Sequence, residues 1–203
     1  MHNRKTARRD DSPVSEVLAK LGNPPKTRSI GKGLVSGIAA GFVGTIAMTQ
    51  FQTAWGKASK AIHGNGSQAQ DSDQHDRTKN ASEDSTMRTA GKLAHLAGRE
   101  LSHEQKVKGG PIVHYGFGTM MGALYGMGME VAPESMRVKK LPYRALGFGS
   151  ALFVGADEIA LPALGLAGKV TETPPSSHLY GYASHLVYGF AAELVRKGVR
   201  RLL

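Results

Sequence analysis

Cysteine is absent from this chain of 203 residues, and tryptophan occurs once. The lack of cysteine excludes a disulfide scaffold, a zinc ribbon, a thiol nucleophile and a cysteine-ligated iron–sulfur cluster. Charge is also missing from most of the apolar sequence. Of the 26 basic and 16 acidic residues, only Asp157 and Glu158 interrupt four apolar stretches, which are 33–56, 109–129, 145–168 and 176–192. The mean hydropathy of −0.26 therefore conceals a chain whose charges are segregated.

These four stretches have lengths typical of membrane-spanning helices. About 20 residues of helix cross a hydrocarbon core, and the stretches hold 24, 21, 24 and 17 residues. The alternative is a soluble bundle of four buried helices. Glycine argues against that alternative, because each glycine inside a water-soluble helix costs about 1 kcal/mol relative to alanine. In a bilayer, unsatisfied backbone groups cost more, so a glycine-rich helix persists.

Small residues recur every four positions in three of the stretches. Such ridges are typical of membrane helices that pack closely. They consist of Gly33, Gly37 and Gly41 in the first stretch, Gly118, Gly122 and Gly126 in the second, and Gly147, Ala151 and Gly155 in the third. An adjacent ridge in the first stretch contains Ser36, Ala40 and Gly44. We therefore expect these positions to lie at contacts between helices.

The pattern predicts an all-α fold, a four-span transmembrane bundle with spans at about 33–56, 109–130, 144–168 and 176–196. Basic residues are concentrated before the first span, between the second and third, and after the fourth. The positive-inside rule then places both termini in the cytoplasm. The first connection disagrees, since 57–108 holds nine basic residues, but it is long and also holds seven acidic ones.

The predicted membrane domain covers 31–203. The segment before this domain and the long connection after its first span each have a distinct composition. Residues 1–30 are basic and lack an apolar period, which predicts a mostly disordered cytoplasmic arm with a short helix at 15–21. Residues 57–84 read as a flexible outer loop. Residues 85–102 predict an amphipathic helix with a basic polar face, whose start Asp84 or Ser85 can cap. This helix either lies in the membrane interface or packs on the bundle.

Titratable side chains inside predicted spans are costly in a bilayer and indicate functional sites. They are His114 in the second span, Asp157 and Glu158 in the third and His185 in the fourth, with His178 near the outer rim. A rise of about 1.5 Å per residue places His114, Asp157 and His185 in one layer near the outer surface. The two adjacent acids point about 100° apart, so we expect only one to face the bundle.

Three interpretations fit this layer of two histidines and a carboxylate. The first is a proton-responsive cluster, because histidine titrates near neutral pH and a nearby carboxylate favours its charged form. The second is a structural polar network that fixes the register of the helices. The third and weakest is a divalent metal site made of His114, His185 and Asp157.

No catalytic motif is present. The chain contains no G-x-S-x-G, P-loop or H-E-x-x-H sequence, and the run 116–118 lacks the preceding strand that dinucleotide binding needs. We therefore expect no enzymatic activity and no cofactor. At the predicted cytoplasmic ends, Glu130 closes the second span, and Glu193 can form a structural pair with Arg196 or Lys197 at helical spacing.

Several short runs resemble the YagU-like family of small bacterial inner-membrane proteins. They are His114-Tyr115, the run Glu-Val-Ala-Pro at 130–133, Pro162 followed by Gly165-Leu166, Ser184-His185-Leu186, and Ala192-Glu193-Leu194 before a basic tail. With the four spans and the helix in the first connection, the resemblance covers about residues 30 to 200. The family is a domain of unknown function, so the resemblance implies a compartment and a topology but no reaction.

The sequence thus predicts a multi-pass inner-membrane protein that senses or conducts protons through His114, Asp157 and His185. The alternative is a structural or accessory subunit whose glycine ridges bind another helix. The expected partners are the lipid bilayer and either a second copy of the chain or another membrane protein. Nucleic acid is not expected, because membrane topology explains the basic charge.

Overall fold

The computed structural model describes residues 28–63, 83–133 and 140–203, and within these ranges it is all-helical without a strand. The predicted arm up to residue 27, with its short helix, and the predicted loop over 64–82 lie outside these ranges. Four long helical segments form the fold. They are α2 (Ile30–His63), α4 (His103–Val131), the continuous run of α5 (Leu141–Leu152), η3 (Phe153–Ala160) and α6 (Leu161–Ala163), and α7 (Pro175–Leu202). The all-α prediction is confirmed for the described residues.

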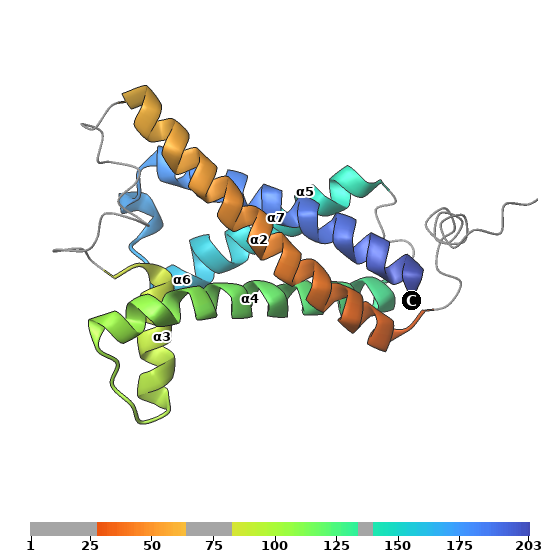
Figure 1. Cartoon of the computed structure of the whole chain (residues 1–203), viewed down its shortest axis with the longest axis horizontal. Helices are drawn as coiled ribbons and strands as arrows, with labels where there is room; N and C mark the ends of the chain where they lie inside the picture. Colours follow the sequence, from red (N-terminus) through yellow and green to blue (C-terminus); the bar gives the residue numbers. More distant parts are fainter. Residues whose placement is uncertain (1–27, 64–82, 134–139) are drawn as a thin grey trace, which may run out of the picture.

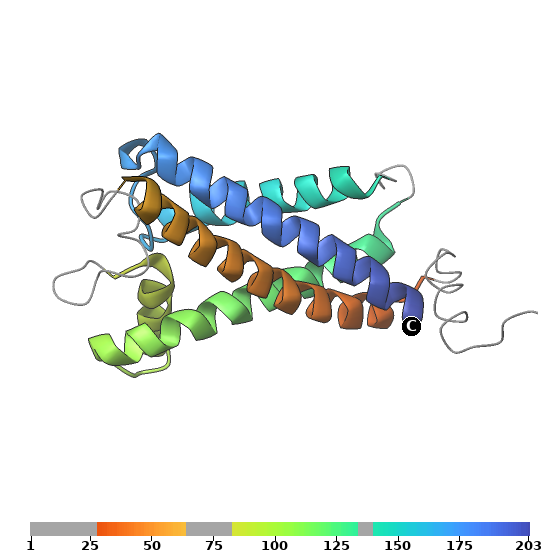
Figure 2. The same cartoon turned by 45° about the horizontal axis from the view of Figure 1, so that its top comes forward.

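The segments are arranged around α2, which packs against both α4 and α7, while α5 packs on α7 (Figures 1 and 2). The start of α2, the end of α4, the start of α5 and the end of α7 lie at one end of the bundle, here called the terminal end. The short helix α3 (Ser85–Leu96) and the 3-10 turn η4 (Val170–Glu172) lie at the opposite end, here called the α3 end.

The interface between α2 and α4 consists of glycines from both helices. A Cβ atom added at Gly37 would lie 2.4 Å from the Gly122 carbonyl oxygen, and one added at Gly41 would lie 2.5 Å from that of Gly118. Real Cβ atoms are not found at such distances, so only glycine allows the two backbones to approach this closely. The first two predicted ridges therefore face each other across this interface.

The adjacent ridge of α2 contacts α7 instead. Ala40 is fully buried, and a Cβ atom at Gly44 would meet the Tyr188 ring at 3.0 Å. The Tyr188 hydroxyl reaches further and donates a hydrogen bond of 2.7 Å to the Gly118 carbonyl oxygen of α4. Two neighbouring ridges on one helix thus bind two different helices.

The third ridge is a correction to the sequence analysis. A Cβ atom at Gly147 or Gly155 would have no described atom within 4 Å, so both face outwards. The contact with α7 uses Gly149, where a Cβ atom would lie 2.5 Å from the His185 carbonyl oxygen. In the same contact, a Cβ atom added at Gly189 of α7 would lie 2.9 Å from the Gly149 amide nitrogen. A period of four residues identifies small faces but does not tell which of them meets a neighbour.

The third helical run also ends earlier than the predicted span, which extended to residue 168. The helix stops at Ala163, and Gly165 adopts a positive φ of 68°. The Leu166 amide donates to the Leu161 carbonyl oxygen at 2.9 Å. This is a common way for a helix to end. A glycine in the left-handed conformation turns the chain, so that an amide beyond the helix donates to a carbonyl of the last turn.

Residues Phe153–Ala160 form a π-helix shortly before Pro162. Proline has no amide hydrogen, so residue 162 cannot donate an α-helical bond to the carbonyl four residues earlier. The Leu161 amide bonds to the Ala156 carbonyl oxygen, five residues back, as π geometry requires. π-helical turns are rare and often occur at functional sites. This one carries both acidic residues of the third predicted span.

The other helices extend beyond the predicted spans. α2 continues to His63, so 57–63 belongs to the helix rather than to the predicted loop. α3 begins as expected, with the Asp84 carboxylate accepting the first amides, but it ends at Leu96 rather than at residue 102. Gly98 just beyond adopts a positive φ of 75°, which turns the chain back toward α4.

Among the described residues, two helical segments are long and apolar enough to cross a membrane, namely Ile30–Ala61 and Leu141–Ala163. Only 11% of the apolar part of the second is buried inside the protein. α4 and α7 are comparably long but less apolar, because charged residues occupy their ends and histidine and tyrosine interrupt their apolar faces. By length and composition alone, the segments Ile30–Ala61 and Leu141–Ala163 suggest a membrane location.

Candidate functional site

Two histidine–carboxylate contacts join α7 to the π-helix η3. His185 Nδ1 lies 3.7 Å from Asp157 Oδ2, and His178 Nδ1 lies 2.7 Å from Glu158 Oε1. The histidines are two helical turns apart on α7, while the acids are adjacent on η3. Each acid contacts a different histidine of α7, so the expectation that only one of the two acids would face the bundle is wrong.

His185 is buried, with 6% of its surface exposed. Its Nδ1 atom lies 2.9 Å from the Gly181 carbonyl oxygen, which assigns the Nδ1 hydrogen to that bond. Nε2 then has no hydrogen-bonding partner among the described residues. The Phe153 ring packs beside the imidazole, with 5.6 Å between the ring centroids. This histidine can accept a proton on Nε2 without breaking an existing hydrogen bond.

His178 has a different environment, in the first turn of α7. Nδ1 faces Glu158, and Nε2 lies 3.1 Å from the Val170 carbonyl oxygen. Both ring nitrogens thus meet acceptors, an arrangement that fits an imidazolium donating from both. The His178 and Glu158 side chains are each about a quarter exposed, at 27% and 19%. Sequence reasoning placed His178 at the outer rim but did not pair it with Glu158.

His114 does not join either pair. Its Nε2 atom lies 3.5 Å from Thr49 Oγ1, across the interface of α4 with α2. No ion pair links it to Asp157 or Glu158 within the described ranges, although His185 lies close enough for the two imidazoles to interact electrostatically. The predicted layer of three groups is therefore one contact, Asp157 with His185, and a separate histidine.

The weak metal interpretation finds no support in this geometry. The described part of the chain contains no group of three or more histidine, cysteine, aspartate or glutamate side chains able to hold a metal ion. His114 is turned toward α2, so it does not complete a ligand set with His185 and Asp157.

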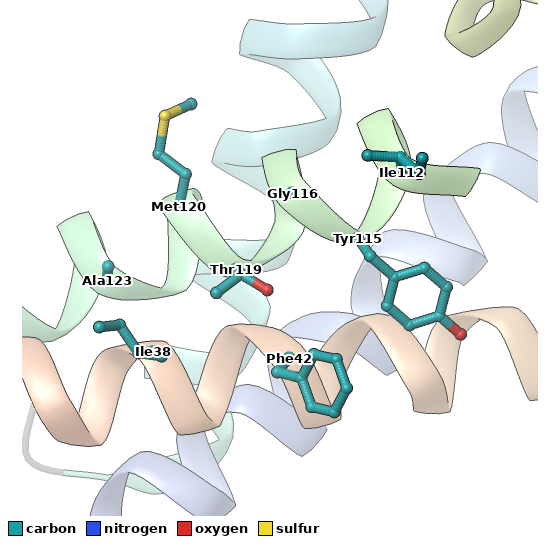
Figure 3. Close-up of a pocket in the computed structure, with 8 residues that line it drawn as sticks. All are labelled: Ile38, Phe42, Ile112, Tyr115, Gly116, Thr119, Met120 and Ala123. Atoms are coloured by element: carbon teal, nitrogen blue, oxygen red, sulfur yellow. The ribbon is translucent and has the colours of Figure 1, made fainter. Parts of the chain in front are cut away.

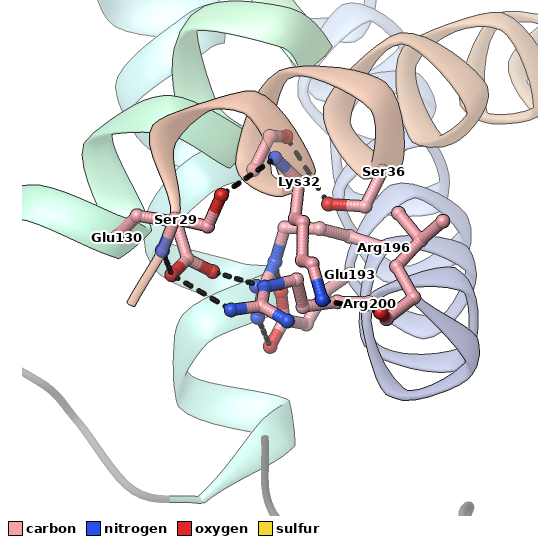
Figure 4. Close-up of polar contacts among 9 residues, drawn as sticks. Ser29, Lys32, Ser36, Glu130, Glu193, Arg196 and Arg200 are labelled. Atoms are coloured by element: carbon pink, nitrogen blue, oxygen red, sulfur yellow. Dashed lines mark hydrogen bonds and ion pairs between the residues drawn. The ribbon is translucent and has the colours of Figure 1, made fainter. Parts of the chain in front are cut away.

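A second polar cluster lies at the terminal end (Figure 4). Glu193 is fully buried and accepts hydrogen bonds of 2.7 and 2.8 Å from Arg196, the partner expected from helical spacing. It also accepts a bond of 3.0 Å from the Tyr125 hydroxyl, and Arg144 approaches to 3.5 Å. One carboxylate thereby connects α4, α5 and α7.

The same cluster contains a pair that sequence reasoning missed. Arg200 donates from Nε to Glu130 Oε1 at 2.6 Å and from Nη2 to Oε2 at 3.1 Å, and both side chains are buried. The Ser29 amide, just before α2, donates to the same carboxylate at 3.0 Å. The only signal in the sequence was an acid at the end of an apolar run, since the partner lies 70 residues away.

A third feature is an apolar groove of about 610 Å³ along the outside of the α2–α4 interface (Figure 3). Ile38 and Phe42 of α2 line one side, and Ile112, Tyr115 and Met120 of α4 line the other. Nearly all of the exposed lining is apolar. The groove therefore suits a hydrocarbon chain better than a polar ligand.

The two polar clusters differ in what they can do chemically. At the terminal end each buried carboxylate is matched by a guanidinium, which holds helices together and keeps its charge at any ordinary pH. At the α3 end the partners are imidazoles, whose charge changes near neutral pH.

Comparison of the chain with protein-family models, with curated proteins and with solved structures found no match in any of the three.

Proposed function

We propose that this chain is an integral protein of the bacterial inner membrane that crosses the bilayer four times. The four long helical segments lie side by side, and each is long enough to span about 30 Å of hydrocarbon. α4 exposes large apolar side chains along its length, among them Ile112, Phe117 and Leu124. Lipid tails would cover such surface. The resemblance to the YagU-like family leads to the same compartment.

The proposed orientation puts the terminal end, with both chain termini, in the cytoplasm. Glu130 and Glu193 are the acidic residues of the described helices at this end, and each forms a buried ion pair with an arginine. Basic residues outnumber them there, namely Arg28, Lys32, Lys140, Arg144, Arg196, Lys197, Arg200 and Arg201. An excess of positive charge marks the cytoplasmic side. At the α3 end, the ring centroids of Trp55 and Tyr180 lie 6.0 Å apart. Tryptophan and tyrosine are enriched where membrane helices meet the lipid headgroups, which fits this end lying at the outer membrane surface.

The contact between His185 and Asp157 carries the functional proposal, which is a response to pH on the outer side of the membrane. A buried imidazole with an unpaired nitrogen sits beside a carboxylate on a π-helical segment. A charged imidazole would attract Asp157 more strongly than a neutral one, and the present distance of 3.7 Å leaves room for a closer contact. The charged His185 would also repel His114, should that imidazole be charged as well. Protonation thus changes the forces between α7, η3 and α4.

A second candidate function is that of a structural or accessory subunit. Its supporting observation is the outward face of the third helical run, where Gly147 and Gly155 meet no described atom. Small residues on a lipid-facing surface allow close approach of another membrane helix. A stable complex with a second protein after mild detergent extraction would favour this role.

The topology is tested by reporter fusions. Fusions after Leu203 and after Lys140 should report a cytoplasmic location, and a fusion near residue 70 a periplasmic one. A cytoplasmic reading near residue 70 would contradict the four-span orientation.

The pH response is tested by hydrogen exchange of the third helical run in proteoliposomes. Between about pH 7.5 and 5, the range that brackets the charge change of histidine side chains in general, the exchange of η3, corrected for intrinsic rates, should change in the wild type. The change should disappear in His185→Gln and be altered in Asp157→Asn. Glu172→Gln is the matched control, because Glu172 is 65% exposed and pairs with Lys169 outside this site. The same exchange at both pH values in the wild type would sink the proposal.

A further inference from the structure

The amphipathic helix α3 is held firmly at the start of α4. Asp84 caps it by accepting the Thr86 and Met87 amides at 2.9 and 2.8 Å. Met87 and Ala90 are buried, and a Cβ atom at Gly109 of α4 would lie only 2.9 Å from that of Ala90. Ahead of the cap, Glu83 pairs with Lys106 of α4 at 2.8 Å. One side of α3 is therefore occupied by the bundle.

The direction of α3 differs from that of the long helices. α3 runs across α4 instead of alongside it, and it projects from the α3 end of the bundle (Figures 1 and 2). If the long helices cross a bilayer, as proposed above, α3 lies along the outer membrane surface. Interfacial amphipathic helices take this orientation, with apolar side chains directed into the lipid.

Two large apolar side chains are exposed on the part of α3 that is not bound to α4. Leu93 is 57% exposed and Leu96 is 76% exposed, the largest value among the large apolar side chains of the described residues. On α4, Ile112 is 73% exposed and borders the apolar groove. α3 and the first half of α4 thus both expose large apolar side chains.

The charge of α3 is of one sign. The helix contains Arg88 and Lys92 and no acidic residue, while His95 Nδ1 lies 2.6 Å from Glu100 Oε1 just beyond the helix. Lys92 donates a hydrogen bond of 2.9 Å to the Leu164 carbonyl oxygen at the end of the third helical run, which ties α3 to a second helix. Basic side chains beside exposed leucines complement a surface of anionic headgroups over hydrocarbon.

We infer that α3 is an interfacial helix that inserts Leu93 and Leu96 into the outer leaflet of a bilayer containing anionic lipid. This inference rests on the proposed membrane topology. It selects lipid as the occupant of the free face, because exposed leucines, positive charge and orientation across the spans occur together on one docked helix.

The absence of native cysteine makes the test direct. Leu96→Cys in the full-length chain is labelled with an environment-sensitive fluorophore and reconstituted in vesicles of phosphatidylcholine and phosphatidylglycerol. Emission should shift to the blue, and lipids spin-labelled near the headgroup should quench it more than lipids spin-labelled near the chain end. The neighbouring His95→Cys is the matched control on the polar face, and its label should respond mainly to aqueous iodide.

A third label separates this inference from the topology on which it rests. Phe42→Cys, near the middle of α2 and 49% exposed, should be quenched by chain-end spin labels. Loss of that quenching would overturn the topology itself. With Phe42 quenched, a Leu96 label that behaves like the His95 label overturns the interfacial helix, as does one shielded from both lipid and iodide by a protein partner. Unchanged Leu96 quenching in pure phosphatidylcholine overturns the preference for anionic lipid.

Discussion

Glu130 and Arg200 form a bidentate ion pair between the ends of α4 and α7, with nitrogen–oxygen distances of 2.6 and 3.1 Å. Both side chains are buried, at 8% and 4% exposed. The two residues are 70 positions apart in the sequence, and the Ser29 amide brings the start of α2 to the same carboxylate. It closes the terminal end of the bundle as a charge-neutral unit.

Removing one partner of this pair should be strongly destabilising. Arg200→Met removes both charge-assisted hydrogen bonds between Arg200 and the buried Glu130 carboxylate, at a cost of about 3–5 kcal/mol in the free energy of unfolding. The double variant with Glu130→Gln should be less harmful than the sum of the two single changes. Unfolding in detergent measures these values. Lys197→Met, on the same helix and only partly buried, is the control, and an equal loss there would contradict the assigned role.

The glycine interface of α2 and α4 should tolerate no side chain at its centre. A Cβ atom at Gly122 would lie 2.3 Å from the Gly41 Cα atom, so Gly122→Ala should cost about 1–3 kcal/mol and Gly122→Leu should separate the helices. Gly116→Ala on the same helix meets no described atom and should be neutral or stabilising. Detergent stability and folded yield provide the comparison. Equal tolerance at both positions would mean that this interface does not form.

The third helical run offers a sharper test, because two glycines two residues apart should behave oppositely. Gly149→Leu should disrupt the packing of α5 on α7, since its Cβ would lie 2.5 Å from the His185 carbonyl oxygen. Gly147→Leu faces open space and should leave the thermal stability of the detergent-solubilised monomer within about 0.5 kcal/mol. The reverse order would restore the ridge expected from sequence and refute the observed packing face.

The Tyr188 hydroxyl should contribute measurably to the free energy of unfolding. It donates the 2.7 Å bond from α7 to the Gly118 carbonyl oxygen of α4, at a buried position where water cannot replace it. Tyr188→Phe should therefore lower the free energy of unfolding by about 1–2 kcal/mol. Tyr143→Phe, on a side chain that is 58% exposed, should change it little. If both variants unfold like the wild type, the interhelical bond contributes nothing.

Much of the helical architecture follows from local sequence. Apolar runs of about 20 residues separated by polar segments predict long helices, and Asp84 predicts the start of α3, because these signals act within one or two turns. The same holds for the Glu193–Arg196 pair, whose members are three residues apart on one helix. The third helical run ends at Ala163, and Pro162 and Gly165 are local signals for this end. The apolar run itself continues to residue 168, and for that reason it predicts a longer span.

The partners across helices were decided only by the tertiary structure. Gly33, Gly37 and Gly41 share a spacing with Gly147 and Gly155, yet the former are buried against α4 and the latter are open, because packing depends on the rotation of each helix about its axis. A repeat of four residues carries no information on that rotation relative to a neighbour.

The polar groups show the same division between composition and arrangement. Sequence position singled out His114, Asp157 and His185 as titratable groups at a similar depth. Only the packed helices turn His114 toward Thr49 and bring His185 to 3.7 Å from Asp157. Depth follows from counting residues along one helix, whereas contact requires that two helices face each other, and that depends on the side chains of both helices together.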